Sequence, residues 1–149
     1  MTKAYESLCK TLSALISGVP HKTANLANAS ALLMQTLPGI SWAGFYLMEN
    51  GILVLGPFQG KTACIEIPVG RGVCGTAVKE NRTRLVPNVH EFPSHIACDS
   101  ASNSEIVVPL RKGGEILGVL DIDSTAFGRF TEEDKEGLES FSEILSASL

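Results

Sequence analysis

The chain has 149 residues, of which 44% are hydrophobic and 19% charged, and its formal net charge is -4 at pH 7. This length and composition predict one globular domain spanning residues 1–149 and exclude fibrous and disordered proteins. Lys and Arg are scattered singly along the chain, so neither nucleic acid nor an anionic membrane surface is an expected partner.

The N-terminus and the cysteines predict the compartment. The opening sequence MTKAYESLCK lacks the apolar segment of a signal peptide, and no apolar run approaches the ~18 residues of a membrane span. We therefore expect a cytoplasmic protein whose four cysteines stay as thiols and are free for chemistry.

Two amphipathic helices are predicted at the start of the chain. Apolar residues recur every three or four positions over residues 5–16 and again over about 22–37, and Gly and Pro follow each segment. Cys9 lies on the apolar face of the first helix, where a free cysteine usually serves as a small core residue.

The periodicity then changes to two, which indicates strands. Residues 41–48 and 52–58 predict a hairpin that turns at 49–51, and residues 63–67 predict a third strand that ends at a proline. Cys64 falls within this third strand, where it would by itself be a core residue.

Two aromatic residues of the first strand share one face. Trp42 and Tyr46 are separated by an even number of positions, and Gly44 between them leaves room beside the rings. Aromatic packing and the wall of a ligand pocket fit this pattern equally well.

A glycine-rich loop follows the third strand. The sequence VGRGVCGTAV, residues 69–78, opens a short helix that ends near Asn81. A helix start presents unpaired backbone amides and the positive end of the helix dipole, so it can hold an anionic group. Cys74 lies in the first turn, and we expect the same field to lower the pKa of its thiol.

An unusually long loop separates the apolar runs 85–86 and 106–110. It has no periodicity of its own, which is typical of a functional loop, and its apolar residues favour a position over the body of the domain. It contains His90, His95 and Cys98. These three residues could bind zinc, although their spacing matches no regular zinc motif.

Residues 105–111 and 115–123 predict a second hairpin. Its second strand is apolar on both faces and is therefore expected to be central in the sheet. Asp121 and Asp123 end that strand and share one face, because side chains alternate along a strand.

The element order predicts an α+β domain. The last helix begins at a capping-box-like sequence, 131–134, and its apolar stripe runs to the end of the chain. Consecutive hairpins flanked by helices predict a central antiparallel sheet of about six strands. The N- and C-terminal helices would pack on one face, and a loop-covered pocket would lie on the other.

The sequence resembles a GAF domain and, more narrowly, the free methionine-(R)-sulfoxide reductase family. The resemblance runs from Trp42 to Asp123 and is strongest in SWAGFYL, KTACIEIPVGRGVCGTAV, HIACDSASNSEIVVPL and ILGVLDIDS. Cys64, Cys74 and Cys98 stand at the family's spacing of ten and twenty-four residues. Ordinary ligand-sensing GAF domains have no reason to carry all three.

The resemblance implies reduction of free L-methionine-(R)-sulfoxide to methionine, with no bound cofactor. Cys98 would be the nucleophile, Cys64 the resolving thiol and Cys74 an auxiliary thiol. Thioredoxin or another dithiol would restore the reduced enzyme. A homodimer through the terminal helices is also common in the family.

The resemblance also implies a substrate pocket. Its carboxylates would be Glu105, Asp121 and Asp123. Trp42 would form a wall, and Tyr46, on the same face of its strand, would join it.

This chemistry agrees with what a sulfoxide requires. Its sulfur becomes electrophilic when its oxygen is protonated, so a thiolate and an acid must act together. Attack by Cys98 yields methionine and a sulfenic acid, which a second thiol converts to a disulfide. The amides at the helix start near Cys74 would suit the substrate carboxylate.

Three carboxyl groups crowded in a desolvated pocket cannot all ionise, so we expect at least one to be protonated near neutrality. Asp123 or Asp121 is the expected proton donor, and Glu105 would hold the substrate ammonium.

For the three acids to converge, the second hairpin needs an irregularity. A regular two-residue turn would place Glu105 opposite Ile122, away from both aspartates. A three-residue loop would pair Glu105 with Asp121, and a bulge near Pro109 would have the same effect.

Alternatives remain open at this stage. Spacing alone would let Cys74 compete with Cys98 as the nucleophile, and Asp121 and Asp123 could merely begin a turn. A ligand-sensing GAF module and a peroxide-sensing thiol switch are the rival functions.

Overall fold

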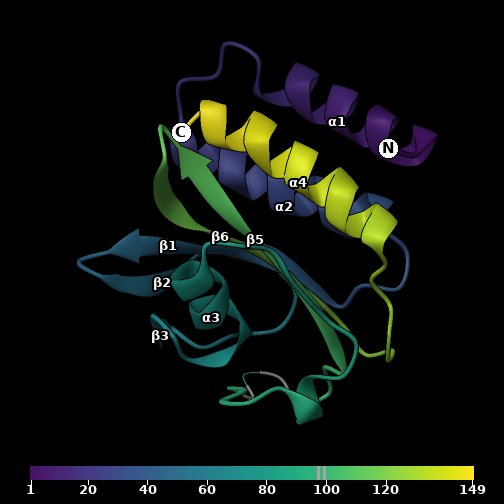
Figure 1. The fold of residues 1–149 in the computed structure, drawn as a ribbon. Coiled ribbons are helices and arrows are strands. Elements are labelled where there is room, and N and C mark those ends of the chain that lie inside the picture. The colour runs from purple at the N-terminus through teal and green to yellow at the C-terminus, as the bar shows by residue number, and fades with distance from the viewer. Residues whose placement is uncertain (97, 99) are drawn as a thin grey trace.

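The computed structural model describes residues 1–96, 98 and 100–149. Within these ranges the chain forms four α-helices, one short 3-10 helix and a six-stranded sheet (Figure 1). In chain order the elements are α1 (Lys3–Ile16), α2 (Lys22–Thr36), β1 (Trp42–Glu49), β2 (Ile52–Gln59), β3 (Glu66–Pro68), α3 (Gly72–Glu80), β4 (Arg84–Val86), η1 (Val89–Glu91), β5 (Ser104–Lys112), β6 (Glu115–Ser124) and α4 (Glu132–Ala147).

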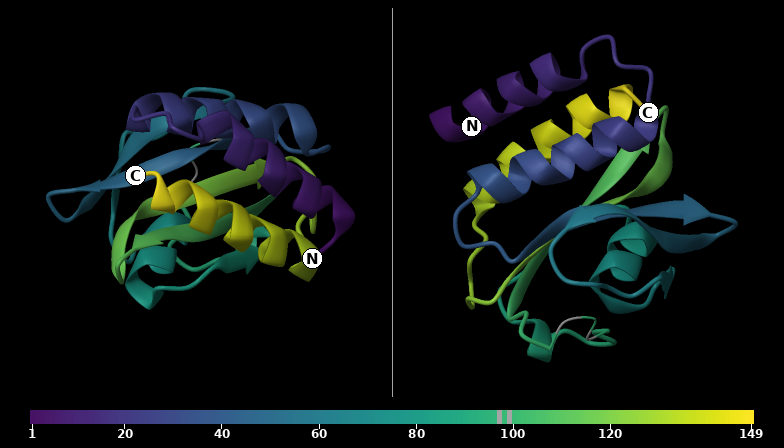
Figure 2. Two further views of the ribbon diagram at one scale, coloured as in Figure 1. Left: turned by 90° about the horizontal axis from the view of Figure 1, so that it is seen from above. Right: turned by 180° about the vertical axis from the view of Figure 1, so that it is seen from behind.

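The sheet separates two layers of the molecule. Neighbouring strands are antiparallel, in the order β3-β2-β1-β6-β5-β4. Helices α2 and α4 lie against one face with α1 packed beside them, and α3 covers part of the other face (Figures 1 and 2). The predicted α+β fold class is confirmed, with β6 in the middle of the sheet.

Each face of the sheet has its own apolar core. The larger cluster lies between the helical layer and the sheet and contains Leu12, Leu33, Phe45, Leu120 and Phe141. Cys9 belongs to this cluster, as predicted. The smaller cluster lies between the sheet and α3 and contains Trp42, Tyr46, Val73, Cys74 and Val107.

The third strand differs from its prediction. Strand β3 begins at Glu66, so Cys64 precedes it instead of lying within it. The hydroxyl of Tyr46 donates a hydrogen bond to the carbonyl oxygen of Cys64 at 2.9 Å. A side chain therefore engages this part of the backbone before the β2–β3 ladder begins.

The β5–β6 hairpin contains the irregularity that the three acids require. Its turn has two residues, because Lys112 pairs with Glu115, so of the two predicted irregularities the three-residue loop is not the one that forms. The register then shifts next to Leu110, where Leu117 of β6 is one residue in excess. The bulge thus lies one residue from the predicted position at Pro109, and its extra residue is on the opposite strand.

The shifted register brings the acids to one face of the sheet. Glu105 pairs directly with Asp123, whereas pairing with Asp121 was predicted. Asp121 is two residues from Asp123 along β6 and therefore points to the same side. Extra twist at a bulge redirects the side chains beyond it, which is a common use of bulges near functional sites.

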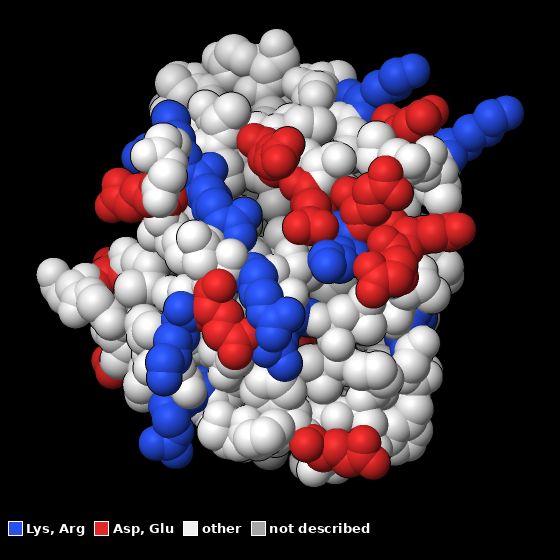
Figure 3. Space-filling view, in the orientation of Figure 1, with Lys and Arg blue, Asp and Glu red and all other residues white. Residues whose placement is uncertain are grey.

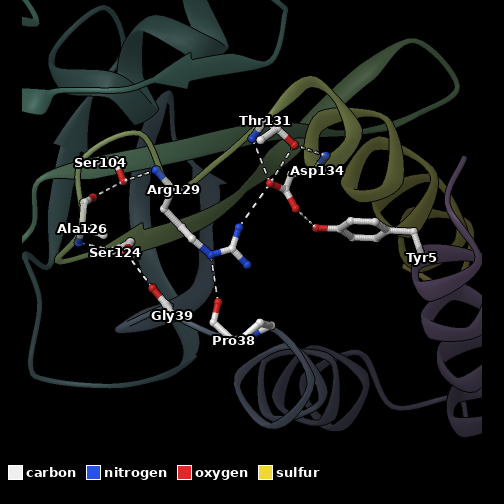
Figure 4. Close-up of polar contacts among 9 residues, drawn as sticks. All are labelled: Tyr5, Pro38, Gly39, Ser104, Ser124, Ala126, Arg129, Thr131 and Asp134. Carbon is white, nitrogen blue, oxygen red and sulfur yellow. Dashed lines mark hydrogen bonds and ion pairs between the residues drawn. The ribbon is translucent and has the colours of Figure 1, made fainter.

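A polar network on the helical side ties α1 to the start of α4 (Figure 4). Asp134 accepts hydrogen bonds from the Tyr5 hydroxyl at 2.6 Å, from the Thr131 backbone amide at 2.8 Å and from Arg129 Nη1 at 3.2 Å. The Thr131 side chain accepts from the Asp134 amide and completes the predicted capping box. These bonds fix where α4 begins.

The same region braces the strand ends that carry the acids (Figure 4). Ser124 donates to the carbonyl oxygen of Gly39, and Ser104 donates to that of Ala126, each at 2.6 Å. Ser104 and Ser124 pair across β5 and β6, one step beyond Glu105 and Asp123. The positions of the two acids are therefore held from outside the pocket.

The surface agrees with the expectation from charge. On the face shown in Figure 3, basic and acidic side chains are interspersed, without a continuous basic area. A search of the described helices finds none that is both long and apolar enough to cross a bilayer.

Candidate active site

A cavity lies on the α3 side of the sheet, under the long loop. Its lining includes all but one of the residues predicted for the site, namely Trp42, Tyr46, Cys74, Cys98, Glu105, Asp121 and Asp123. The exception, Cys64, is bonded to Cys98. Strands β1, β5 and β6, helix α3 and the loop thus converge on one site.

The loop covers the cavity, as its apolar residues predicted. His95, Ile96 and Cys98 all line the cavity. The backbone amide of Gly72, the first residue of α3, donates to the carbonyl oxygen of Ser94 at 3.0 Å. This bond fastens the loop to the start of α3.

Cys64 and Cys98 form a disulfide. Their Cα atoms are 5.4 Å apart, although the residues are separated by 34 positions in the sequence. This distance is within the range that a disulfide spans without backbone movement. Both residues are half-buried. The pairing that the family resemblance implied is therefore present in this structure.

Cys74 lies deeper than the disulfide and is chemically different. Its Sγ atom is 4.0 Å from Oε2 of Glu105, and the residue is buried. Burial, and after it the charges of Asp121 and Glu105, raise the pKa of the Cys74 thiol well above its usual value. The predicted lowering of this pKa by the helix start is wrong, because desolvation and the neighbouring acids outweigh the helix dipole. A thiol that keeps its proton is a poor nucleophile.

The carboxyl groups crowd together as expected. Burial raises the pKa of Glu105 well above its usual value, and the charges of Asp121 and Asp123 raise it further. Burial also raises the pKa of Asp121, although hydrogen bonds from Glu105 and Cys74 act in the opposite direction. The pKa is therefore raised more strongly for Glu105 than for Asp121, which accepts a hydrogen bond from Glu105.

One oxygen of this cluster is left over. Oδ1 of Asp121 is buried and has no hydrogen-bond partner among the residues that the structure describes. Buried polar groups are normally paired, and the exceptions call for an explanation. The Oγ atom of Ser102, another residue of the cavity lining, is buried and unpaired in the same sense. Ser102 was not predicted, because a serine in a polar loop is not distinctive in a sequence.

Trp42 and Tyr46 form one wall of the cavity. Their ring centroids are 6.1 Å apart with 23° between the ring planes. Nε1 of Trp42 donates to the carbonyl oxygen of Lys61 at 2.9 Å, so both aromatic residues hold the segment that leads to Cys64. A Cβ atom at Gly44 would come 2.2 Å from Cβ of Phe58. This glycine therefore permits the close packing behind the wall.

The alternative zinc site is not assembled. His90 is hydrogen-bonded to Asn103 at 2.8 Å, and the sulfur of Cys98 is in the disulfide. His95 lines the cavity, and burial lowers the pKa of its ring. In the described part of the chain, the potential ligand atoms that do lie together, within 4.8 Å of one another, belong to Cys74, Glu105 and Asp121.

Comparison with known proteins decides the family. The model of the GAF domain family matches residues 21–149. The free methionine-R-sulfoxide reductase of Escherichia coli (strain K12) is 60% identical over 137 residues, which cover 92% of this chain and 83% of the relative. This chain belongs to the free methionine-R-sulfoxide reductase family. The resemblance inferred from the cysteine spacing is confirmed.

Solved structures support the same assignment. The fRMsr of Staphylococcus aureus in complex with substrate is 52% identical, with a TM-score of 0.93 over 97% of this chain and 95% of the other. The free methionine-R-sulfoxide reductase of Neisseria meningitidis, also in complex with its substrate, is 42% identical, with a TM-score of 0.94 over 99% and 90% of the two chains. The free methionine-R-sulfoxide reductase fold thus extends over nearly the whole chain.

The cavity is small in this disulfide-bonded member of the free methionine-R-sulfoxide reductase family. In this oxidised form its volume is about 40 Å³. One water needs roughly 10–15 Å³, so the enclosed space holds a few waters.

Proposed function

We propose that this chain reduces free methionine-(R)-sulfoxide to methionine, with residues 1–149 acting as one catalytic domain. The observation that carries the proposal is the Cys64–Cys98 disulfide beside a cavity that contains three carboxyl groups. A dithiol that can close into a disulfide and a protonated acid are the two things that sulfoxide reduction needs. The 60% identity to a free methionine-R-sulfoxide reductase supports the choice of substrate.

Cys98 is the nucleophile in this proposal. Its thiolate attacks the sulfoxide sulfur, and the oxygen passes to Cys98 with a proton. Methionine is released and Cys98 becomes a sulfenic acid. The thiol of Cys64 then attacks that sulfur, water leaves, and the disulfide forms. Cys74 takes no part in the disulfide and is an auxiliary thiol that donates toward Glu105.

The carboxyl groups supply the proton and bind the ammonium group. Glu105 holds a proton in the resting site, and Asp121 accepts a hydrogen bond from it. A substrate ammonium favours ionised Glu105, so the proton moves to Asp121, which can then donate it to the sulfoxide oxygen. Asp121 is thus the proton donor, and Glu105 holds the ammonium together with Asp123. Trp42 and Tyr46 enclose the substrate's methyl group and side chain.

Incubation of the reduced protein with each sulfoxide epimer and dithiothreitol tests this assignment. We expect methionine from the R epimer, none with Cys98→Ser, and slower turnover with Cys64→Ser, because dithiothreitol must then reduce the oxidised nucleophile directly. Cys9→Ala, in the core on the other side of the sheet, is the matched control. Disulfide formation with peroxide but no methionine would instead indicate a thiol switch, and binding without turnover would indicate a ligand sensor.

A protein dithiol such as thioredoxin is the proposed reductant, and no bound cofactor takes part. Ile65 follows Cys64 directly and is 69% exposed. An exposed apolar side chain beside a disulfide suits the docking of a partner that must bring its own thiolate to that bond. This reductant belongs to a reducing compartment, so the proposal includes a cytoplasmic location.

The docking site can be tested without touching the chemistry. We expect Ile65→Asp to lower turnover supported by thioredoxin about tenfold and to leave turnover supported by dithiothreitol unchanged. Leu15→Asp, which puts the same charge on the exposed face of α1, is the control and should change neither turnover, even where it shifts the proposed association of the terminal helices. Equal losses with both reductants would mean that Ile65 serves the site and not the partner.

The proposal also includes a homodimer through the terminal helices. Sedimentation of the same proteins tests this assembly.

A further inference from the structure

Ser102 contributes the one buried hydroxyl of the cavity that has not been explained. The residue is 6% exposed, lines the cavity and lies four positions after Cys98. Its Oγ atom has no hydrogen-bond partner among the described residues. Because burying an unpaired hydroxyl costs free energy, a position like this one suggests a partner that arrives from outside.

Two other hydrogen-bond donors of the cavity lining, those of Tyr46 and Trp42, are already engaged. The Tyr46 hydroxyl donates to the backbone of Cys64, and Nε1 of Trp42 donates to that of Lys61. Ser102 therefore offers a donor that binding need not first detach from the protein.

A free amino acid brings two charged groups, and their needs differ. The ammonium is attracted to the acids, whereas the α-carboxylate is repelled by them and requires hydrogen-bond donors. We infer that Ser102 donates a hydrogen bond to the α-carboxylate of the substrate. This inference rests on the proposed reductase function and assigns a subsite within the same cavity.

The start of α3 strengthens such a subsite. Val73 and Cys74, in the first turn of that helix, line the cavity together with Ser102. The positive end of the helix dipole favours an anion there. A peptide-bound methionine sulfoxide has a neutral amide in place of the carboxylate and would gain less from both elements.

The test compares Ser102→Ala with the wild type in steady-state turnover of free methionine-(R)-sulfoxide and of its amide. We expect Ser102→Ala to raise KM for the free amino acid about tenfold, with kcat within about twofold, because a hydrogen bond to a charged group is lost. KM for the amide should change little, so the ratio of KM for the amide to KM for the free amino acid should fall. Ser102→Thr, which keeps the hydroxyl, should restore most of the preference.

Thermal unfolding separates this role from a structural one. Ser102→Ala removes no hydrogen bond to the residues that the structure describes, so its Tm should equal or exceed that of the wild type. Ser142→Ala is the matched control, because Ser142 on α4 is likewise buried with an unpaired Oγ but lies outside the cavity. It should show a similar Tm and an unchanged KM.

The outcomes distinguish the inference from the function on which it rests. Wild-type protein that makes no methionine would reject the reductase itself. An active wild type with an unchanged KM in Ser102→Ala would overturn the carboxylate contact. A fall in kcat at constant KM would also overturn it, because the hydroxyl would then serve the sulfoxide oxygen.

Discussion

Asp134 and Asp121 are both buried aspartates, 8% and 5% exposed, yet they lie on opposite sides of the sheet in opposite surroundings. Asp134 accepts hydrogen bonds from Tyr5, Thr131 and Arg129, so the cost of removing it from water is offset by donors (Figure 4). Asp121 lies beside another acid and has one oxygen without a partner in the described chain. A buried aspartate thus stabilises the fold on the helical side of the sheet, whereas a buried aspartate in the cavity is suited to chemistry.

This difference indicates how the two halves of the molecule divide their tasks. Burial together with Asp134 raises the pKa of Tyr5, so its hydroxyl remains a neutral donor to that carboxylate. On the cavity side, burial and the neighbouring aspartates raise the pKa of Glu105, which favours the protonated form of a group that is ordinarily ionised at neutral pH. A satisfied polar network rigidifies, whereas an incompletely satisfied one is the usual state of a site that awaits a substrate.

The largest effect is expected when Asp121, the buried aspartate of the cavity, is replaced. Asp121→Asn should lower kcat by about 10²–10⁴-fold, because loss of a general acid typically costs that much. The free energy of unfolding at pH 7 should not fall, since Asp121 leaves an oxygen unpaired in the first place. Turnover with dithiothreitol and urea unfolding measure the two quantities. A variant with normal kcat would remove Asp121 from the proton donor's role.

The next largest effect is expected on the helical side. Asp134→Ala should lower the free energy of unfolding by about 3 kcal/mol, because several hydrogen bonds and the capping box are lost together. Turnover per folded molecule should be unchanged well below Tm. Tyr5→Phe removes a single bond of the same network and should cost about 1 kcal/mol. An Asp134→Ala protein with normal stability would contradict the structural role.

Periodicity was enough to predict most of this fold. The helices, both hairpins and the capping box follow from local patterns, and the cysteine spacing identified the family. The bulge was harder to place, because it depends on how β6 meets its neighbour. A Cβ atom at Gly118 would come 2.2 Å from the Tyr46 carbonyl oxygen, so this glycine was the signal of a close backbone approach next to the bulge.

Burial explains what the sequence did not reveal about the site. A cysteine in the first turn of a helix predicts a lowered pKa only if the thiol stays near water, and Cys74 is instead buried in the apolar cluster between α3 and the sheet. Ser102 has its role only because the loop folds over the cavity. Both properties depend on contacts between distant segments, which local patterns do not contain.

The comparison can be sharpened by measuring how stability changes with pH. The folded protein keeps a proton on Glu105 at pH values where the unfolded chain has lost it, because burial raises the pKa of this group in the folded state. The contribution of this proton to the free energy of unfolding is fully present below the usual glutamate pKa, roughly 4.3. It is lost as the pH rises from there through the pKa of Glu105 in the folded protein. Glu105→Gln is neutral at every pH, so this decline should be absent and the variant should gain on the wild type between pH 5 and pH 8. Urea unfolding at both values measures the gain, with Glu143→Gln on the exposed side of α4 as the control. Equal slopes for wild type and Glu105→Gln would mean that Glu105 is ionised in the folded protein, and the resting proton would have to be reassigned.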